Sequence, residues 1–119
     1  MLKIEIISFS LKDGGAGIAA NKFKSLLRNT SLNLKVNSIT QDDSGKYHFF
    51  KRLISYVLSL LQLDGNPTKH SLNLFTFRPI KTLLKKNTDE KIYHIHWINN
   101  DTLSIFDFHK IPSGSIITL

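Results

Sequence analysis

The feature that most constrains the fold is the order of apolar patterns in the N-terminal third of the chain. Residues 3–9, KIEIISF, are a short run rich in isoleucine, which predicts a buried strand. A turn at Gly14-Gly15 follows, and apolar residues then recur at helical spacing over residues 16–28. Residues 32–39, LNLKVNSI, alternate as a second strand would. These patterns together predict a βαβ unit, whose two strands are parallel.

The remaining patterns continue the alternation of helices and strands. We expect helices over residues 47–63, 79–86 and 103–109, and strands over residues 91–97 and 115–119. This order predicts an α/β fold with a mostly parallel Rossmann-like sheet and helices on both faces. Right-handed crossovers place the first strand at the centre, between the second strand and the 91–97 strand. At 119 residues and 41% hydrophobic, the chain is expected to form one domain, residues 1–119.

The helix over residues 47–63 has the clearest period in the chain. Its apolar positions are Phe50, Leu53, Ile54, Val57, Leu58 and Leu61. Polar residues lie on the opposite face: His48, Arg52, Ser55, Ser59 and Gln62. The favoured interpretation is that the apolar face packs on the core. The alternative is peripheral association with an anionic membrane surface, since the start of the helix is basic at Lys46, Lys51 and Arg52.

Composition narrows the classes of partner and compartment. A formal charge of +7 favours anionic partners, but the basic residues are scattered and form no Arg-rich arm, so nucleic acid is not expected. The chain has no cysteine, which excludes disulfides and thiol nucleophiles and suits the cytoplasm. Its start lacks the apolar stretch of a signal peptide, and no segment reaches the roughly 20 apolar residues of a membrane span.

The turn at Gly14, Gly15 and Ala16 is a candidate phosphate site. It joins a strand to a helix N-terminus, where free amide groups favour an anion and absent side chains let a phosphate approach the backbone. The turn has neither the G-x-G-x-x-G nor the Walker spacing, so it specifies no particular nucleotide. The alternative is a tight turn with close packing of strand on helix.

A second candidate site lies at the end of the 91–97 strand. His94, His96, Trp97, Asn99 and Asn100 cluster at the sheet edge where open α/β folds bind ligands. Their hydrogen-bonding groups and the indole face suit a sugar. Strand alternation puts the two histidines on one face and Trp97 on the other. No third ligand accompanies the histidines, so no metal is expected, and His94 is as readily a hydrogen-bonded core residue.

Two segments together carry a resemblance to a known family. GGAGIAANKFKSLL follows the first strand, and HIHWINNDTLSIFDFHKI includes the second candidate site. In these segments the chain resembles retaining glycosyltransferases of the two-Rossmann-domain (GT-B) type, especially those of bacterial capsule and exopolysaccharide synthesis. In such proteins the strand matching IITL commonly continues with His-Asp, and here IITL ends at Leu119. The chain differs at Gly17, where relatives often carry a larger residue, and at Lys12-Asp13.

The resemblance implies a function and a set of site residues. It implies transfer of a sugar from a nucleotide-sugar donor to a saccharide or lipid-linked acceptor, without a cofactor. Gly14 and Gly15 would approach the donor diphosphate, and His96, Trp97 and Asn99 would lie near the cleft floor. A second domain would supply most donor contacts, so residues 1–119 are expected to be a truncated N-terminal domain, inactive alone. The alternative is a non-catalytic Rossmann-like module that binds a nucleotide or a protein.

Overall fold

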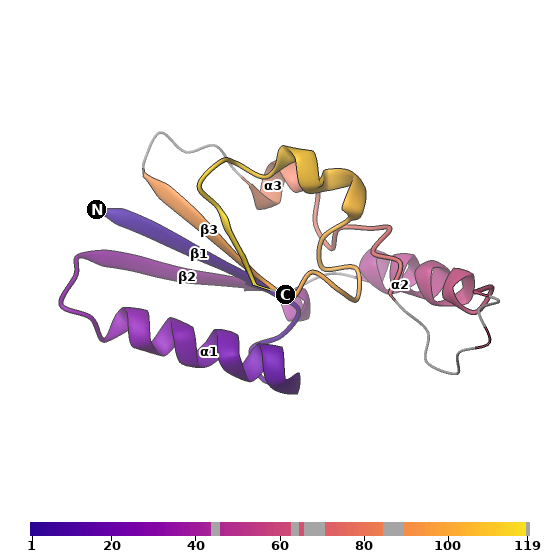
Figure 1. The fold of residues 1–119 in the computed structure, drawn as a ribbon, viewed down its shortest axis with the longest axis horizontal. Helices are drawn as coiled ribbons and strands as arrows, with labels where there is room; N and C mark the ends of the chain where they lie inside the picture. Colours follow the sequence, from indigo (N-terminus) through magenta and orange to yellow (C-terminus); the bar gives the residue numbers. More distant parts are fainter. Residues whose placement is uncertain (44–45, 63–64, 66–70, 85–89, 119) are drawn as a thin grey trace.

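The computed structural model shows an α/β protein with a four-stranded, all-parallel sheet in the order β2-β1-β3-β4 (Figure 1). The structure describes residues 1–43, 46–62, 65, 71–84 and 90–118. The strands are β1 (Leu2–Ser8), β2 (Leu34–Thr40), β3 (Lys91–His96) and β4 (Ile116–Thr118). The helices are α1 (Gly14–Arg28), α2 (Lys46–Ser59) and α3 (Ile80–Leu83), with short 3₁₀ turns η1 (Gln41–Asp43) and η2 (Ile105–Lys110). The architecture is consistent with a Rossmann-like fold.

Strand β1 is central, as the sequence predicts. It pairs in parallel with β2, with Leu2 beside Leu34, and with β3, with Lys3 beside Lys91. An ion pair of 3.0 Å between Glu5 and Lys91 joins β1 to β3. The predicted βαβ unit and the central position of the first strand are therefore confirmed.

One face of the sheet is covered by α1. Ala20 of the helix is buried against Ile4, Ile6 and Val36, and Figure 1 shows α1 running along this face. The Lys24 ammonium also donates a hydrogen bond of 2.6 Å to Ser38 Oγ. The small residue at position 20 lets the helix lie close to the strands.

The opposite face is covered by α3 and the segment around η2 (Figure 1). The buried side chains on this face are Ile7, Phe77, Ile80, Leu83, Leu84, Tyr93, Ile95 and Leu103. Helix α3 begins after Pro79, which suits a helix start because it has no N–H to leave unpaired. It ends at Leu83, earlier than the predicted Lys86, and residues 85–89 lie outside the described part of the chain.

Helix α2 lies beyond the carboxyl ends of the strands (Figure 1) and packs in the reverse of the predicted sense. Its polar residues His48, Ser55 and Ser59 are buried, whereas Phe50 and Val57 are exposed. The prediction that the apolar face packs on the core is wrong. The reason is a polar contact: His48 Nε2 donates a hydrogen bond of 3.0 Å to the side-chain oxygen Oε1 of Gln41, which attaches the polar face of α2 to the residue that follows β2.

The helix predicted over residues 103–109 begins later, at Ile105. Ser104 is its N-cap, and Ser104 Oγ accepts a hydrogen bond of 3.2 Å from the N–H of Phe106. Residues 99–102, which precede Ser104, form a turn. A serine hydroxyl at this position satisfies an N–H that the helix leaves free.

Candidate functional site

A cavity of about 450 Å³ lies where β1 and β3 end. Its lining residues are Ser8, Phe9, Ser10, Asp13, Gly14, Gly15, Ala16, Gly17, Trp97 and Asn100. Because β2 and β3 flank β1 on opposite sides, the chain leaves β1 here at the point where strand order reverses. The cavity therefore lies at the position where doubly wound sheets bind ligands, and it joins the two candidate sites of the sequence.

The serines at the end of β1 hold the turn that precedes α1. Ser10 Oγ accepts hydrogen bonds from the N–H groups of Lys12 and Asp13, at 3.1 and 3.2 Å. Ser8 Oγ donates to the carbonyl oxygen of Ser10 at 2.9 Å. These short-range bonds fix the loop without help from a ligand.

The glycines of the turn serve two different purposes. A β-carbon on Gly17 would lie 2.8 Å from the Ser10 carbonyl oxygen, so this glycine allows the helix to pack closely on the loop. A β-carbon on Gly14 or Gly15 would meet nothing within 4 Å. Gly14 also has a φ of +72°, a conformation that favours glycine. Gly14 and Gly15 line the cavity and have open space around them, whereas Gly17 is the packing glycine.

The N-terminus of α1 lies at the cavity. Asp13 is the N-cap residue but its side chain makes no capping hydrogen bond. Residues 14–17 line the cavity. Unpaired amides at a helix N-terminus favour an anionic group. The Asp13 carboxylate, which also lines the cavity, opposes this preference by its charge.

Trp97 closes the cavity from the side of β3. The backbone N–H of Trp97 donates to the carbonyl oxygen of Thr118 at 2.9 Å, and the φ of 61° at Trp97 turns the chain out of the strand. Trp97 is 38% exposed and lines the same cavity as the glycine turn. Asn100, with a φ of 58°, lines the cavity as well, and its carbonyl oxygen accepts from Gln41 Nε2 at 2.9 Å.

His96 and Asn99 lie elsewhere. The His96 ring is buried beneath α1, 4.0 Å from the His94 ring and 5.8 Å from the Phe23 ring between centroids. Asn99 Oδ1 accepts a hydrogen bond of 2.9 Å from Asn73 Nδ2. Neither residue is in the lining of the cavity. Their role in substrate binding stays a prediction, and the placement of His96 favours packing.

Burial favours the neutral form of both histidines. Burial, with a smaller contribution from the charge of His96, lowers the pKa of His94 to about 4. Burial also lowers the pKa of His96. His94 Nε2 lies 3.0 Å from Thr118 Oγ1, so the ring has a hydrogen-bonding partner on β4. Strand alternation is as predicted, since Tyr93 and Ile95 pack on the other face.

The sequence analysis did not include Ser8, Ser10 and Asp13 in either candidate site, although all three line the cavity. The two serines flank Phe9 at the end of a strand and precede a glycine turn. That position in the sequence could have indicated that they lie at the binding edge of the sheet. Within the described residues, no group of three His, Cys, Asp or Glu side chains could hold a metal ion. None of the described helices is both long and apolar enough to cross a membrane.

We compared the chain with models of protein families, with curated proteins and with solved structures, and none of the three comparisons found a match.

Proposed function

We propose that this chain is the N-terminal Rossmann-like domain of a glycosyltransferase of the GT-B type. The enzyme would transfer a sugar from a nucleotide-sugar donor to a saccharide or lipid-linked acceptor. The observation that supports the proposal best is the shared cavity. Residues of the Gly14–Gly17 turn and Trp97, which belong to the two segments that resemble this family, line one cavity although they are distant in sequence.

The chemistry of the cavity suits a phosphorylated sugar compound. Amide groups of the α1 N-terminus would bind a phosphate, and the absence of side chains at Gly14 and Gly15 leaves room for it. The partly exposed indole of Trp97 would pack on the apolar face of a sugar ring. A volume of about 450 Å³ is within the range of small-ligand sites.

A binding module without catalysis is the second candidate. Among the described residues that line the cavity, Asp13 is the one with an ionisable side chain. A cavity with one carboxylate offers recognition but little acid–base chemistry of its own. In the glycosyltransferase proposal a second domain supplies the missing contacts. The module would bind a nucleotide or a protein without catalysis, and sugar transfer by a polypeptide that includes the second domain separates the two candidates.

The fluorescence of Trp97 tests the proposed site directly. Trp97 is the one tryptophan of the chain, so its emission reports on the cavity alone. We expect the Trp97 emission to change on titration with UDP-glucose or GDP-mannose and to level off as the site becomes saturated. In Gly15→Val the added side chain would enter the open space, and we expect binding to weaken at least about tenfold, roughly 1.4 kcal/mol.

The matched control is Ala19→Val, an exposed position one turn further along α1. It adds β-branching to the same helix away from the cavity, and we expect donor binding to stay unchanged. No saturable change with either nucleotide sugar, or equal affinity in Gly15→Val, would reject the site.

A further inference from the structure

We propose that α2 binds an anionic membrane surface through its exposed apolar face. This inference goes beyond sugar transfer, and it rests on the packing and charge of α2 rather than on the cavity.

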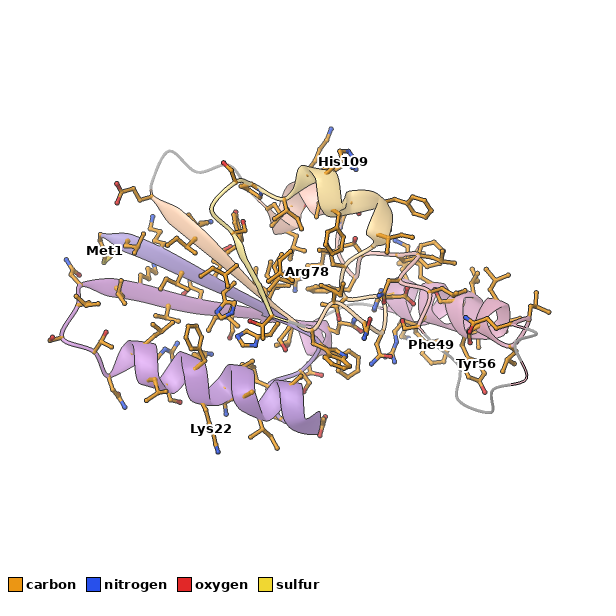
Figure 2. The ribbon with its side chains drawn as sticks, viewed as in Figure 1. Met1, Lys22, Phe49, Tyr56, Arg78 and His109 are labelled. Atoms are coloured by element: carbon orange, nitrogen blue, oxygen red, sulfur yellow. The ribbon has the colours of Figure 1, made fainter. Side chains whose placement is uncertain are left out.

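The helix presents a large set of apolar side chains to solvent. From α2 and the two residues after it these are Tyr47, Phe49, Phe50, Leu53, Ile54, Tyr56, Val57, Leu58, Leu60 and Leu61. Phe50 is 63% exposed and Leu61 is 67% exposed. Figure 2 labels Phe49 and Tyr56 at one edge of the helix. A contiguous exposed apolar surface of this kind marks a site of interaction with a membrane or another molecule.

The apolar face is free because the polar face makes the contacts with the rest of the protein. His48 bonds to Gln41, and its ring lies 6.2 Å from that of Phe77 between centroids. The Arg52 guanidinium lies over the Phe9 ring at 5.1 Å. A helix held by one face leaves the opposite face available to a partner.

The charges of α2 favour an anionic lipid surface as that partner. Its sequence, KYHFFKRLISYVLS, contains no Asp or Glu, and Lys46, Lys51 and Arg52 are all exposed. The chain as a whole has a formal charge of +7. Basic residues beside an apolar helix face bind acidic headgroups while the apolar side chains enter the interface. Tyrosine and phenylalanine suit that depth, because aromatic rings are favoured at the membrane–water boundary.

A second copy of the chain is the less favourable occupant. Pairing two α2 faces would bring together the Lys46 and Lys51 groups of two molecules that each have a charge of +7. Like charges across an interface oppose association. An acidic bilayer can take up the apolar side chains of α2 and also attracts its basic residues.

Vesicle flotation of the purified chain tests the proposal without any nucleotide. We expect the chain to float with vesicles of equal parts phosphatidylcholine and phosphatidylglycerol. We expect it to bind pure phosphatidylcholine vesicles at least about tenfold more weakly, because these lack the negative charge that attracts the basic residues of α2. Added salt should release it.

Matched variants identify the surface that binds. Phe50→Asp should weaken flotation at least about tenfold, whereas Leu26→Asp should not; Leu26 is 68% exposed on α1 and undergoes the same change of charge. Lys51→Gln should weaken binding to acidic vesicles more than Lys22→Gln, which removes an exposed lysine pointing outward from α1 (Figure 2).

Three results would overturn the proposal. They are no flotation with acidic vesicles, equal loss in Leu26→Asp, or a melting temperature that falls in Phe50→Asp as for a core substitution. If the protein does not bind vesicles, sediments as a dimer, and becomes a monomer in Phe50→Asp, the apolar face of α2 binds a second copy of the chain. Failure here leaves the Trp97 titration unaffected, so the two proposals stand or fall separately.

Discussion

Gly15 and Gly17 are two residues apart, and the structure predicts opposite effects when each is replaced by alanine. At Gly17 the new β-carbon would lie 2.8 Å from the carbonyl oxygen and 3.3 Å from the carbonyl carbon of Ser10. Both neighbours are backbone atoms, so the loop or the helix must shift. At Gly15 the β-carbon would meet nothing within 4 Å.

The expected sizes follow from two opposing terms. Overpacking costs about 1–3 kcal/mol, while alanine in place of glycine within a helix gains up to about 1 kcal/mol. We therefore expect Gly17→Ala to lower the free energy of unfolding by about 1–2 kcal/mol. In Gly15→Ala nothing is overpacked, and only the higher helix propensity of alanine acts. That gain is smaller in the first turn of a helix, so we expect the free energy of unfolding to rise by about 0.5 kcal/mol.

Urea unfolding of both variants beside the parent chain measures these differences, and thermal melts provide a second readout. For a domain of this size about 1 kcal/mol corresponds to a shift of a few degrees in the melting temperature. The slopes of the urea transitions should agree, so that midpoints compare directly. Equal stability of the two variants, or a more stable Gly17→Ala, would refute the assignment of Gly17 as the packing glycine.

Two further predictions concern charge. His94 has a folded pKa of about 4 against an ordinary 6.5, so below 6.5 the unfolded chain takes up a proton that the folded chain does not. Stability should be full above pH 6.5 and fall by up to about 3 kcal/mol as the pH drops towards 4. Urea unfolding at about pH 7 and about pH 4.5 measures this, and His94→Gln should reduce the dependence. Asp13→Asn should strengthen binding of a nucleotide sugar about fivefold, roughly 1 kcal/mol, because it removes a negative charge beside the proposed phosphate. The Trp97 titration checks it, and a weaker affinity would show that the carboxylate contributes to binding.

The arrangement of the sheet could be predicted from the sequence because local patterns decide it. An isoleucine-rich run, a glycine turn and a helical period define the βαβ unit around β1. The handedness of crossovers then places β3 on the other side of β1. Both steps need only the order of the elements.

The orientation of α2 could not be predicted, because periodicity shows that a helix has two faces and not which one packs. Apolar burial usually decides which face packs, and here polar hydrogen bonds decide it. Gln41 Nε2 donates to Thr102 Oγ1 at 3.0 Å, and Gln41 Oε1 accepts from His48 of α2. The helical period of residues 47–63 does not indicate that Gln41 is held by a residue on another strand–helix connection.

Only part of the candidate site could be predicted from the sequence. The glycine turn and the end of the 91–97 strand could be recognised separately, and the parallel topology brings them to one edge. Trp97 reaches the cavity through a left-handed φ, and His96 remains in the strand with its ring beneath α1. A pattern of apolar and polar residues does not predict a left-handed backbone conformation at a single residue such as Trp97.

The position of β1 between β2 and β3 has a consequence for how the cavity is maintained. Next to the glycine turn, Ser8 at the end of β1 pairs with Thr40 of β2, which is close in sequence. Trp97 follows His96 of β3, which pairs with the same Ser8 across a much longer loop of chain. Closing a longer loop costs more conformational entropy. A disturbance that separates β3 from β1 would therefore remove the indole wall of the cavity while the glycine turn keeps its shape.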